Sequence, residues 1–483
     1  MFLPIGAFLT GTRRRSRGWG TRPPLVPAAG ARWHPGVGVG EVRGREPPAP
    51  AAGRDRSEGA LSRDTWTQRD EGVIVMLVAA LDALDTRPPQ GATPAVKPTG
   101  QPERLFTPAF ALLWAASFCV FLSFYLLLPL LPVYAAGLGM GESSIGLVIG
   151  VFALASMVWK PWAGWVVDWR GRRGILMAGA ALFALANLCY PAARSAAPLL
   201  LVRVVHGTGM GLFPTAAVAI VTDLVPAARR GEAMGLFGMA ANLGLAVGPA
   251  LAGPAEAWLG FTGVCVLATG LATAGTALAF LTRDTARRTA RPPLRLRGLL
   301  APQALYPAAL TLLALVPYGA LMAFLPLLVR ERGIASAGLF FTLIAAALLV
   351  IRTTAGQLSD RLGRPIVVAP ALAVVAASLL VVAVARAPWA IYGAGLLFGL
   401  GFGGAQPALM AWAADLVPPG DRGKAMATYY TAWELGIGGG QIALGALLSV
   451  AGFAGLFAAA AMMPLIGAAL ALARVPTARA RVT

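Results

Sequence analysis

The residues best suited to chemistry in this chain are the few ionisable ones that fall inside long apolar segments. Glu434 is a carboxylate well inside one such segment, and Arg203 and His206 lie close together inside another. Residues three apart share a face of a helix, and an imidazole changes its charge near neutral pH. Because a charge at membrane depth is costly, these three residues are candidates for coupling to a proton, with Glu434 the first choice.

Each of these residues also has a purely structural interpretation. Glu434 could form an ion pair that ties its helix to a neighbour, with Arg352 as the candidate partner, and His206 could be a hydrogen-bonded packing residue. Lys160 either extends its ammonium group to the membrane rim or balances a buried acid. The sequence leaves these alternatives open.

A second set of charges lies in a short loop between two apolar segments. The stretch from Gly164 to Arg173 carries Asp168 and, in the turn itself, Arg170, Arg172 and Arg173. A loop this short allows only a tight turn between two helices, so the charges must lie at one membrane face.

The same pattern returns 192 residues later. The pairs at this constant offset include Gly164 and Gly356, Asp168 and Asp360, Gly171 and Gly363, Arg172 and Arg364, Asp223 and Asp415, and Lys160 and Arg352. Matches at one offset, without a gap, indicate an internal duplication. A parallel repeat of two membrane halves is a transporter architecture in which the substrate site lies at the interface between the halves.

Composition places the chain in the membrane. Of its 483 residues, 57% are hydrophobic and 13% are charged, whereas soluble domains carry about 25% charged residues. The apolar runs predict twelve helical spans, near 106–134, 144–167, 175–193, 198–224, 233–254, 259–282, 303–329, 337–358, 366–385, 388–416, 425–449 and 453–473. We therefore expect an all-α membrane protein with two six-helix bundles, 105–282 and 303–475, a linker at 283–302 and a tail at 476–483.

Basic residues predict the orientation of these spans. If the N-terminus is inside, the inner loops and the C-terminal tail hold 18 Arg and Lys residues and the outer loops hold 4. Both termini and the Asp168 hairpin are therefore expected in the cytoplasm, in a multi-pass protein of the cell membrane. Since the arginines serve as topology signals, the net charge of +19 does not indicate a nucleic-acid partner.

Residues 1–104 have a different composition, rich in Arg, Pro, Gly and Ala, and we expect them to be disordered. Residues 77–84 could form a short helix. An alternative is that translation begins near Met76, because Asp70-Glu71-Gly72 is compatible with a ribosome-binding stretch just upstream.

These motifs resemble those of the major facilitator superfamily, over about residues 105–475. The pattern Gly-x-x-x-Asp-x-x-Gly-Arg-Arg follows the second span, a weaker copy follows the eighth, and Arg203 and Gly207 match a segment of the fourth. The fifth span resembles the glycine signature associated with antiporters, at Gly235, Gly244, Gly248, Pro249 and Gly253. The resemblance favours the twelve-helix branch of drug/proton antiporters.

The resemblance implies two bundles that rock around a central cavity. It also implies a cytoplasmic ion-pair network of Asp168, Arg172 and Asp223, repeated at Asp360, Arg364 and Asp415. Arginine offers fixed, bidentate geometry to a carboxylate, so such a network could act as a latch. The competing interpretation is that these charges are topology signals only.

Aromatic and amide side chains are candidates for the cavity lining. They are Phe121, Phe124, Tyr125, Tyr318, Gln406, Tyr429, Tyr430 and Trp433. Many members of the family that export cationic drugs carry an acid in the first span or nearby. The first span of this chain has no charge, so the resemblance argues against a strongly cationic substrate. Each aromatic residue could equally be ordinary packing.

These observations predict a secondary transporter that exports small amphipathic or apolar compounds in exchange for protons. Uptake of a sugar or organic acid by symport is the alternative, and a non-transporting receptor or scaffold is a further one. The chain lacks a phosphate-binding loop of the Gly-x-x-x-x-Gly-Lys-Ser/Thr type, and Cys119, Cys189 and Cys265 lack metal-ligand spacing. We therefore expect no cofactor, no metal and no enzymatic activity, in a monomer whose partners are the substrate, protons and the lipid bilayer.

Overall fold

The computed structural model describes residues 107–226, 229–282, 284–285, 300–334 and 336–475, without the side chains of 352 and 353. The expectations for the N-terminal tail, for most of the 283–302 linker and for residues 476–483 therefore fall outside the described residues.

The described residues are almost entirely helical. They form α2 (Pro108–Leu127), α3 (Leu130–Gly137), α4 (Glu142–Arg170), α5 (Arg173–Cys189), α6 (Ala196–Leu224), α7 (Arg230–Leu281), α8 (Leu305–Glu331), α9 (Ala337–Leu362), α10 (Arg364–Val384), α11 (Pro388–Asp415) and α12 (Arg422–Leu472). Within the described ranges, nine of the helical segments are long and apolar enough to cross a membrane, and α9, which is bent, raises this number to ten. The predicted fold class is confirmed.

The two longest helices each contain a break. In α7 the backbone leaves the helical conformation at Gly260, where φ is 65°, and in α12 it does so at Gly452, where φ is 64°. This φ region strains residues that carry a Cβ, so glycine is suited to both breaks. Dividing α7 and α12 at these glycines is consistent with the twelve predicted spans.

Local sequence signals explain where several helices begin. Thr107 caps α2, because its hydroxyl accepts a hydrogen bond from the Phe110 backbone N–H at 3.2 Å, and Pro108 occupies the first turn. In the hairpins before α5 and α10, Gly171 and Gly363 have φ values of 118° and 99°. The motif glycines therefore allow the chain to reverse within one or two residues.

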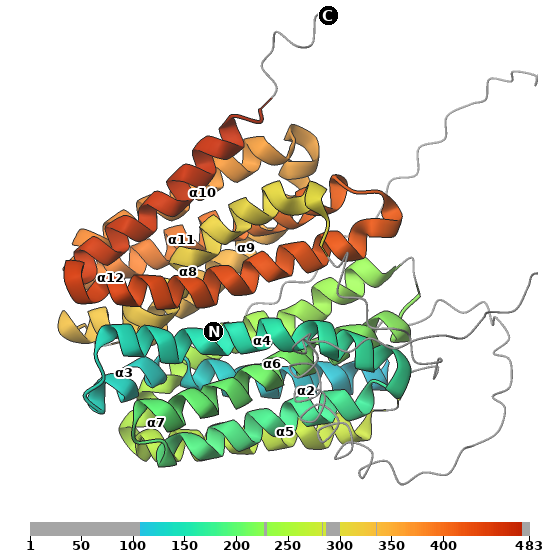
Figure 1. Ribbon diagram of the computed structural model, residues 1–483, viewed down its shortest axis with the longest axis horizontal. Helices are drawn as coiled ribbons and strands as arrows, with labels where there is room; N and C mark the ends of the chain where they lie inside the picture. Colours follow the sequence, from blue (N-terminus) through green and yellow to red (C-terminus); the bar gives the residue numbers. More distant parts are fainter. Residues whose placement is uncertain (1–106, 227–228, 283, 286–299, 335, 476–483) are drawn as a thin grey trace, which may run out of the picture. The chain divides into compact units, whose positions relative to one another are not determined.

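The helices fall into two groups with matching internal contacts, α2–α7 and α8–α12 (Figure 1). In the first group α2 packs on α7 and α4 packs on α6; in the second, α8 packs on α12 and α9 packs on α11. We call these groups the N-bundle and the C-bundle. They meet where α4 contacts α12 and where α7 contacts α9.

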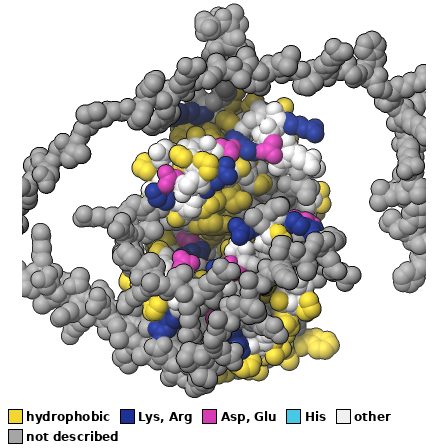
Figure 2. Space-filling model, turned by 90° about the vertical axis from the view of Figure 1, so that its right-hand side faces the viewer, with side chains coloured by type: hydrophobic (Ala, Val, Ile, Leu, Met, Phe, Trp, Pro, Cys, Tyr) yellow, Lys and Arg dark blue, Asp and Glu magenta, His cyan; other side chains and the backbone are white. Residues whose placement is uncertain are grey.

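We call the two ends of the bundles the hairpin end and the far end. The hairpin end carries Gly171 and Gly363, and the far end carries the breaks at Gly260 and Gly452. Figure 2 looks onto the hairpin end and shows basic and acidic side chains around a recess with hydrophobic side chains.

Candidate functional site

An ion pair joins the two bundles within the membrane-spanning region. The Lys160 ammonium group of α4 pairs with the Glu434 carboxylate of α12. The Glu434 side chain is 9% exposed and the Lys160 side chain is 29% exposed. The Lys160 nitrogen also lies 5.8 Å from the centre of the Tyr430 ring. The partner of Glu434 is thus Lys160; the side chain of Arg352, the candidate from the sequence, is not described.

Towards the far end, the same two helices touch through their backbones. A Cβ atom placed on Gly150 of α4 would lie 2.6 Å from the carbonyl oxygen of Gly438 in α12, and one on Gly438 would lie 2.8 Å from the oxygen of Gly150. Closer to the far end, a Cβ on Gly445 would lie 2.9 Å from the Cα of Gly146. Such approaches leave no room for a side chain. We call this contact the α4–α12 seam.

A second seam joins α7 and α9, and it is the duplicate of the first. Gly338 of α9 abuts the backbone of Pro249 and Ala250 in α7, and the Thr342 hydroxyl donates to the Ala246 carbonyl at 2.8 Å. Shifted by 192 residues, Gly146 corresponds to Gly338 and Ala246 to Gly438. The two seams are equivalent contacts, so the same close helix packing joins the bundles twice at the far end.

At the hairpin end, the first motif forms a polar network inside the N-bundle. The Arg172 guanidinium group pairs with Asp223 and donates to the Ala219 carbonyl at 2.7 Å. The Thr285 hydroxyl donates to Asp223 at 2.7 Å, and the Asp284 carboxylate accepts the Arg172 backbone N–H at 3.1 Å. Burial lowers the pKa of Arg172 from its usual value, and the charges of Asp168 and Asp284 oppose that shift.

Other motif residues of the N-bundle take different positions. The Arg173 guanidinium group lies over the Phe280 ring, 4.5 Å from its centre, and donates to the Phe280 carbonyl. A Cβ on Gly171 would lie 2.5 Å from the Asp284 carboxylate, whereas Gly164 has open space around it.

The second motif forms the corresponding network inside the C-bundle. Arg364 pairs with Asp415 at 2.9 Å and with Asp360 at 2.5 Å, and it donates to the Ser359 hydroxyl at 3.0 Å. Its Gly356 has open space, as Gly164 does. The ion pairs of Arg172 and Arg364 each join elements of one bundle. In this conformation they tie together the helix ends within a bundle, whereas the Lys160–Glu434 ion pair and the Thr342–Ala246 hydrogen bond join the two bundles.

His206 lies in a closed aromatic compartment of the N-bundle. It is fully buried; its Nδ1 shares a 2.8 Å hydrogen bond with the Tyr190 hydroxyl, and the Phe183 ring centre lies 4.5 Å away. Arg203 donates to the carbonyls of Val148 and Ile149 at 3.2 and 2.7 Å. These contacts fix α6 against α4 and α5, as expected for the packing alternative, and the role of His206 with protons stays a prediction.

The predicted cavity residues separate into several groups. In the N-bundle, Phe124 stacks on Phe152 at 5.0 Å between ring centres. In the C-bundle, Tyr318 stacks on Phe402 at 5.0 Å, and Phe402 in turn contacts Trp433. The remaining candidates divide by environment: Phe121 and Tyr429 are buried, Tyr125 and Gln406 are partly buried, and Tyr430 is exposed.

The antiporter-like glycines of α7 also have distinct surroundings. Gly244 and Gly248 pack against the backbone of α2, where a Cβ on Gly248 would lie 2.8 Å from the Tyr125 carbonyl carbon. Pro249 belongs to the α7–α9 seam, while Gly235 and Gly253 have open space. Part of this motif is therefore a helix-packing surface.

Some contributors were not singled out from the sequence. Asp284, Thr285 and Ser359 join the hairpin networks, and Gly146 and Gly150 form the α4–α12 seam. The 192-residue offset, which relates Gly146 to Gly338, was a signal that could have found the seams. Among the described residues, no three His, Cys, Asp or Glu side chains lie together as metal ligands.

Several known proteins are similar to this chain in sequence or in fold. Curated relatives include the quinolone resistance protein NorA of Staphylococcus aureus (strain Mu50 / ATCC 700699), 29% identical over 136 residues, which are 28% of this chain and 35% of NorA. The chain thus matches about a third of the length of NorA. The uncharacterized MFS-type transporter YhhS of Shigella flexneri is 29% identical over 355 residues, covering 71% of this chain and 87% of YhhS.

Solved structures share the fold. The human organic anion transporter MFSD10 (TETRAN) has a TM-score of 0.58 at 22% identity, over 76% of this chain and 100% of MFSD10. A POT family transporter in complex with a thioalcohol-conjugated peptide has a TM-score of 0.66 at 14% identity, over 75% and 95% of the two chains. The family model described as Major Facilitator Superfamily matches residues 113–350 and 307–483. Given that match and the duplicated bundles, this chain belongs to the major facilitator superfamily of membrane transporters.

Proposed function

We propose that this transporter exports small amphipathic or apolar organic compounds in exchange for protons, by alternating access of its two bundles. The observation that carries the proposal is the Lys160–Glu434 ion pair between the bundles. The hairpin end is taken as cytoplasmic, in accord with the distribution of basic residues.

The ion pair couples a titratable group to the relative position of the bundles. Glu434 belongs to α12 and Lys160 to α4, so separating these helices breaks the pair. A buried, charged carboxylate without its partner is unfavourable. When Glu434 is protonated, separating it from Lys160 costs much less free energy. Proton binding to Glu434 therefore lowers the cost of opening the far end, and proton release favours closing it.

Of the two positions that the duplication relates at this level, only the one in the C-bundle carries a carboxylate. The position equivalent to Glu434 in the N-bundle is Asn242, which does not titrate in the physiological range. A single carboxylate at this level suits the movement of a proton in one step of the cycle. We assign Glu434 as the coupling residue and Lys160 as the partner that responds to its charge.

The substrate class is inferred from aromatic residues of the C-bundle and from the relatives. Tyr318, Phe402 and Trp433 form a continuous aromatic series, and Tyr430 is exposed beside Lys160. Aromatic rings offer apolar contact area and stacking partners to organic molecules. The name of NorA refers to quinolone resistance, and a quinolone is therefore a suitable first probe.

The test is transport by the purified protein in proteoliposomes with an imposed pH gradient. Quinolone flux and the pH of the lumen are followed together for the wild type, Glu434→Gln and Glu232→Gln. Glu232 is the control carboxylate, because it is exposed at the hairpin end and pairs with Arg229. We expect the wild type and Glu232→Gln to exchange substrate for protons, and Glu434→Gln to lose the dependence of flux on the gradient.

Two results would contradict the proposal. Flux with the same pH dependence in Glu434→Gln and the wild type would remove Glu434 from coupling. The absence of flux for a panel of amphipathic compounds, with protein of native stability, would favour the receptor or scaffold alternative.

A further inference from the structure

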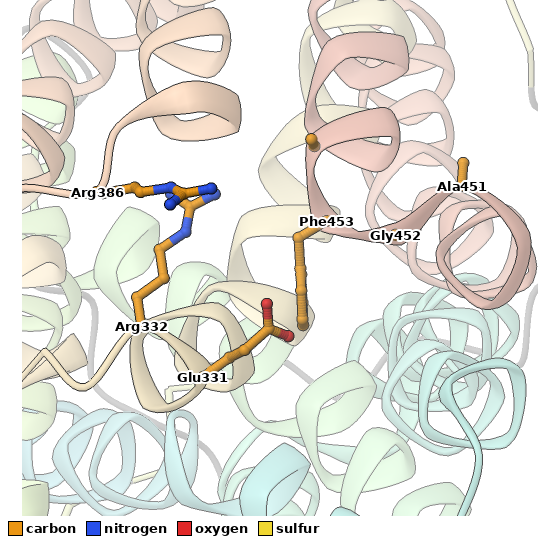
Figure 3. A pocket seen from close by; sticks show the side chains of 7 residues that line it. Glu331, Arg332, Arg386, Ala451, Gly452 and Phe453 are labelled. Carbon is orange, nitrogen blue, oxygen red and sulfur yellow. The ribbon is translucent and has the colours of Figure 1, made fainter.

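The far end of the C-bundle contains a charged pocket. None of the residues that line it belongs to the two seams or to the Lys160–Glu434 ion pair. Its volume is about 490 Å³, and it is lined by Glu331 at the end of α8, Arg332 just after it, Arg386 before α11, and residues 451–454 at the break of α12 (Figure 3). Figure 3 shows the guanidinium groups of Arg332 and Arg386 close to one another and the Glu331 carboxylate pointing towards Phe453.

The N-bundle has an equivalent pocket of about 500 Å³. Shifted by 192 residues, Arg194 corresponds to Arg386, Gly260 to Gly452 and Phe261 to Phe453. The pocket is therefore a feature of the duplicated unit, formed where the glycine break turns the chain between two spans.

The two copies differ in their charge and filling. In the N-bundle the Tyr134 ring stacks on Phe261 with 3.9 Å between ring centres, and Arg194 is the single charged lining residue. In the C-bundle two arginines and one glutamate line the pocket. Phe453 repeats Phe261, but Pro326 takes the place of Tyr134, so the stack of two rings is not repeated. The N-bundle pocket thus provides an internal control for the charged copy.

The two arginines of the C-bundle pocket differ in their hydrogen bonds. Arg332 donates through Nη1 and Nη2 to the carbonyls of Val382, Ala383 and Ala385, which leaves its Nε–H and one Nη2–H available. Burial lowers the pKa of Arg332 from its usual value; the charge of Glu331 raises it and that of Arg386 lowers it. Arg386 is exposed and makes no hydrogen bond or ion pair with the described part of the chain. Two like charges held this close favour an anion between them.

The surroundings of the pocket are suited to lipid. Val384, Trp389 and Val450 flank it in the chain and are 77%, 79% and 84% exposed. Exposed apolar residues with a tryptophan at the end of a span are typical of the membrane interface. A ligand that reaches this pocket from the bilayer would place its head group among the charged residues and its acyl chains along the exposed apolar side chains.

We propose that the Arg332–Arg386 pocket binds a phosphate ester, supplied as the head group of a membrane phospholipid that carries a protonated amine. Arginine forms bidentate, charge-assisted hydrogen bonds with phosphate oxygens. Glu331 offers a carboxylate to the amine, so an aminophospholipid such as phosphatidylethanolamine is favoured over phosphatidylglycerol. This site is independent of the proposed coupling by Glu434.

The experiment measures lipid binding and not transport. Purified protein in detergent is titrated with phosphatidylethanolamine or phosphatidylglycerol, and bound lipid is counted by native mass spectrometry. Arg386→Gln is the test variant, because Arg332 holds the end of α10 and its loss could disturb folding. Arg194→Gln is the matched control in the N-bundle pocket. Melting temperatures without added lipid check that both variants fold.

We expect Arg386→Gln to bind phosphatidylethanolamine roughly tenfold more weakly than the wild type, and Arg194→Gln to match the wild type. Glu331→Gln should reduce the preference for phosphatidylethanolamine over phosphatidylglycerol. Unchanged binding in Arg386→Gln, or an equal loss in Arg194→Gln, would overturn the site. Equally tight binding of soluble glycerophosphoethanolamine would overturn the assignment to a membrane lipid.

Discussion

At the scale of single residues, Lys160 of α4 pairs with Glu434 of α12 and so joins the two bundles. The sequence identified Glu434 as an unusual carboxylate, but it did not determine which basic residue faces it. The helices concerned are apolar around most of their circumference, so hydropathy does not define which side of each helix meets the other bundle. The partner follows only from the packing of α4 on α12.

Charge reversal tests this pair directly. Lys160→Glu places two acids in contact, and we expect it to destabilise the protein by about 1–3 kcal/mol. This loss of stability is smaller than that for breaking a fully buried ion pair, because Lys160 is partly exposed. The double variant Lys160→Glu, Glu434→Lys should recover most of that loss, as measured by thermal unfolding in detergent.

The control for charge reversal is Lys424→Glu. Lys424 forms an exposed pair with Asp421, with side chains 51% and 43% exposed, and surface pairs contribute about 0–1 kcal/mol. A double variant no more stable than Lys160→Glu would show that the ion pair between the bundles does not form in the protein.

At the scale of helices, much of the fold was predictable. The spans expected at 144–167 and 175–193 correspond to α4 and α5, because long apolar runs bounded by charged or glycine-containing turns leave little choice of helix position. The hairpin pairs Arg172–Asp223 and Arg364–Asp415 were also expected, from the family pattern and its repeat. The role of Asp284 was not, since it depends on where the chain passes after α7.

The seams give a prediction at this scale. Gly150→Leu inserts a side chain where the Gly438 carbonyl leaves no room, so we expect the far end to remain open and transport to fall by more than about tenfold. Packing within each bundle is not affected by this change, and the melting temperature should change little. Flux in proteoliposomes and thermal unfolding provide the two measurements.

Gly270→Leu is the matched control for the seam. Gly270 is also helical, but it is exposed and has open space around its Cα. Transport by Gly150→Leu at the level of Gly270→Leu would mean that the tight α4–α12 contact is not part of the transport cycle.

At the scale of the whole molecule, the distribution of basic residues predicts the orientation in the membrane. Gly141 lies at the far end and Gly420 at the hairpin end, and a side chain fits at both. In a background with the three free cysteines replaced by serine, we expect a membrane-impermeant maleimide to label Gly141→Cys on intact cells. Gly420→Cys should be labelled only after permeabilisation, and the reverse pattern would place the termini outside.

The closure at the far end has a consequence for the kinetics of the cycle. Main-chain atoms of α4 and α12 meet there directly, so no rotation of a side chain can create a passage. The proposed alternating access therefore requires the bundles to move apart as rigid bodies. Collective motions of that kind take microseconds to milliseconds, far longer than the picoseconds to nanoseconds of a rotamer change. The rate at which this exit opens should therefore depend little on the size of the molecule waiting behind it.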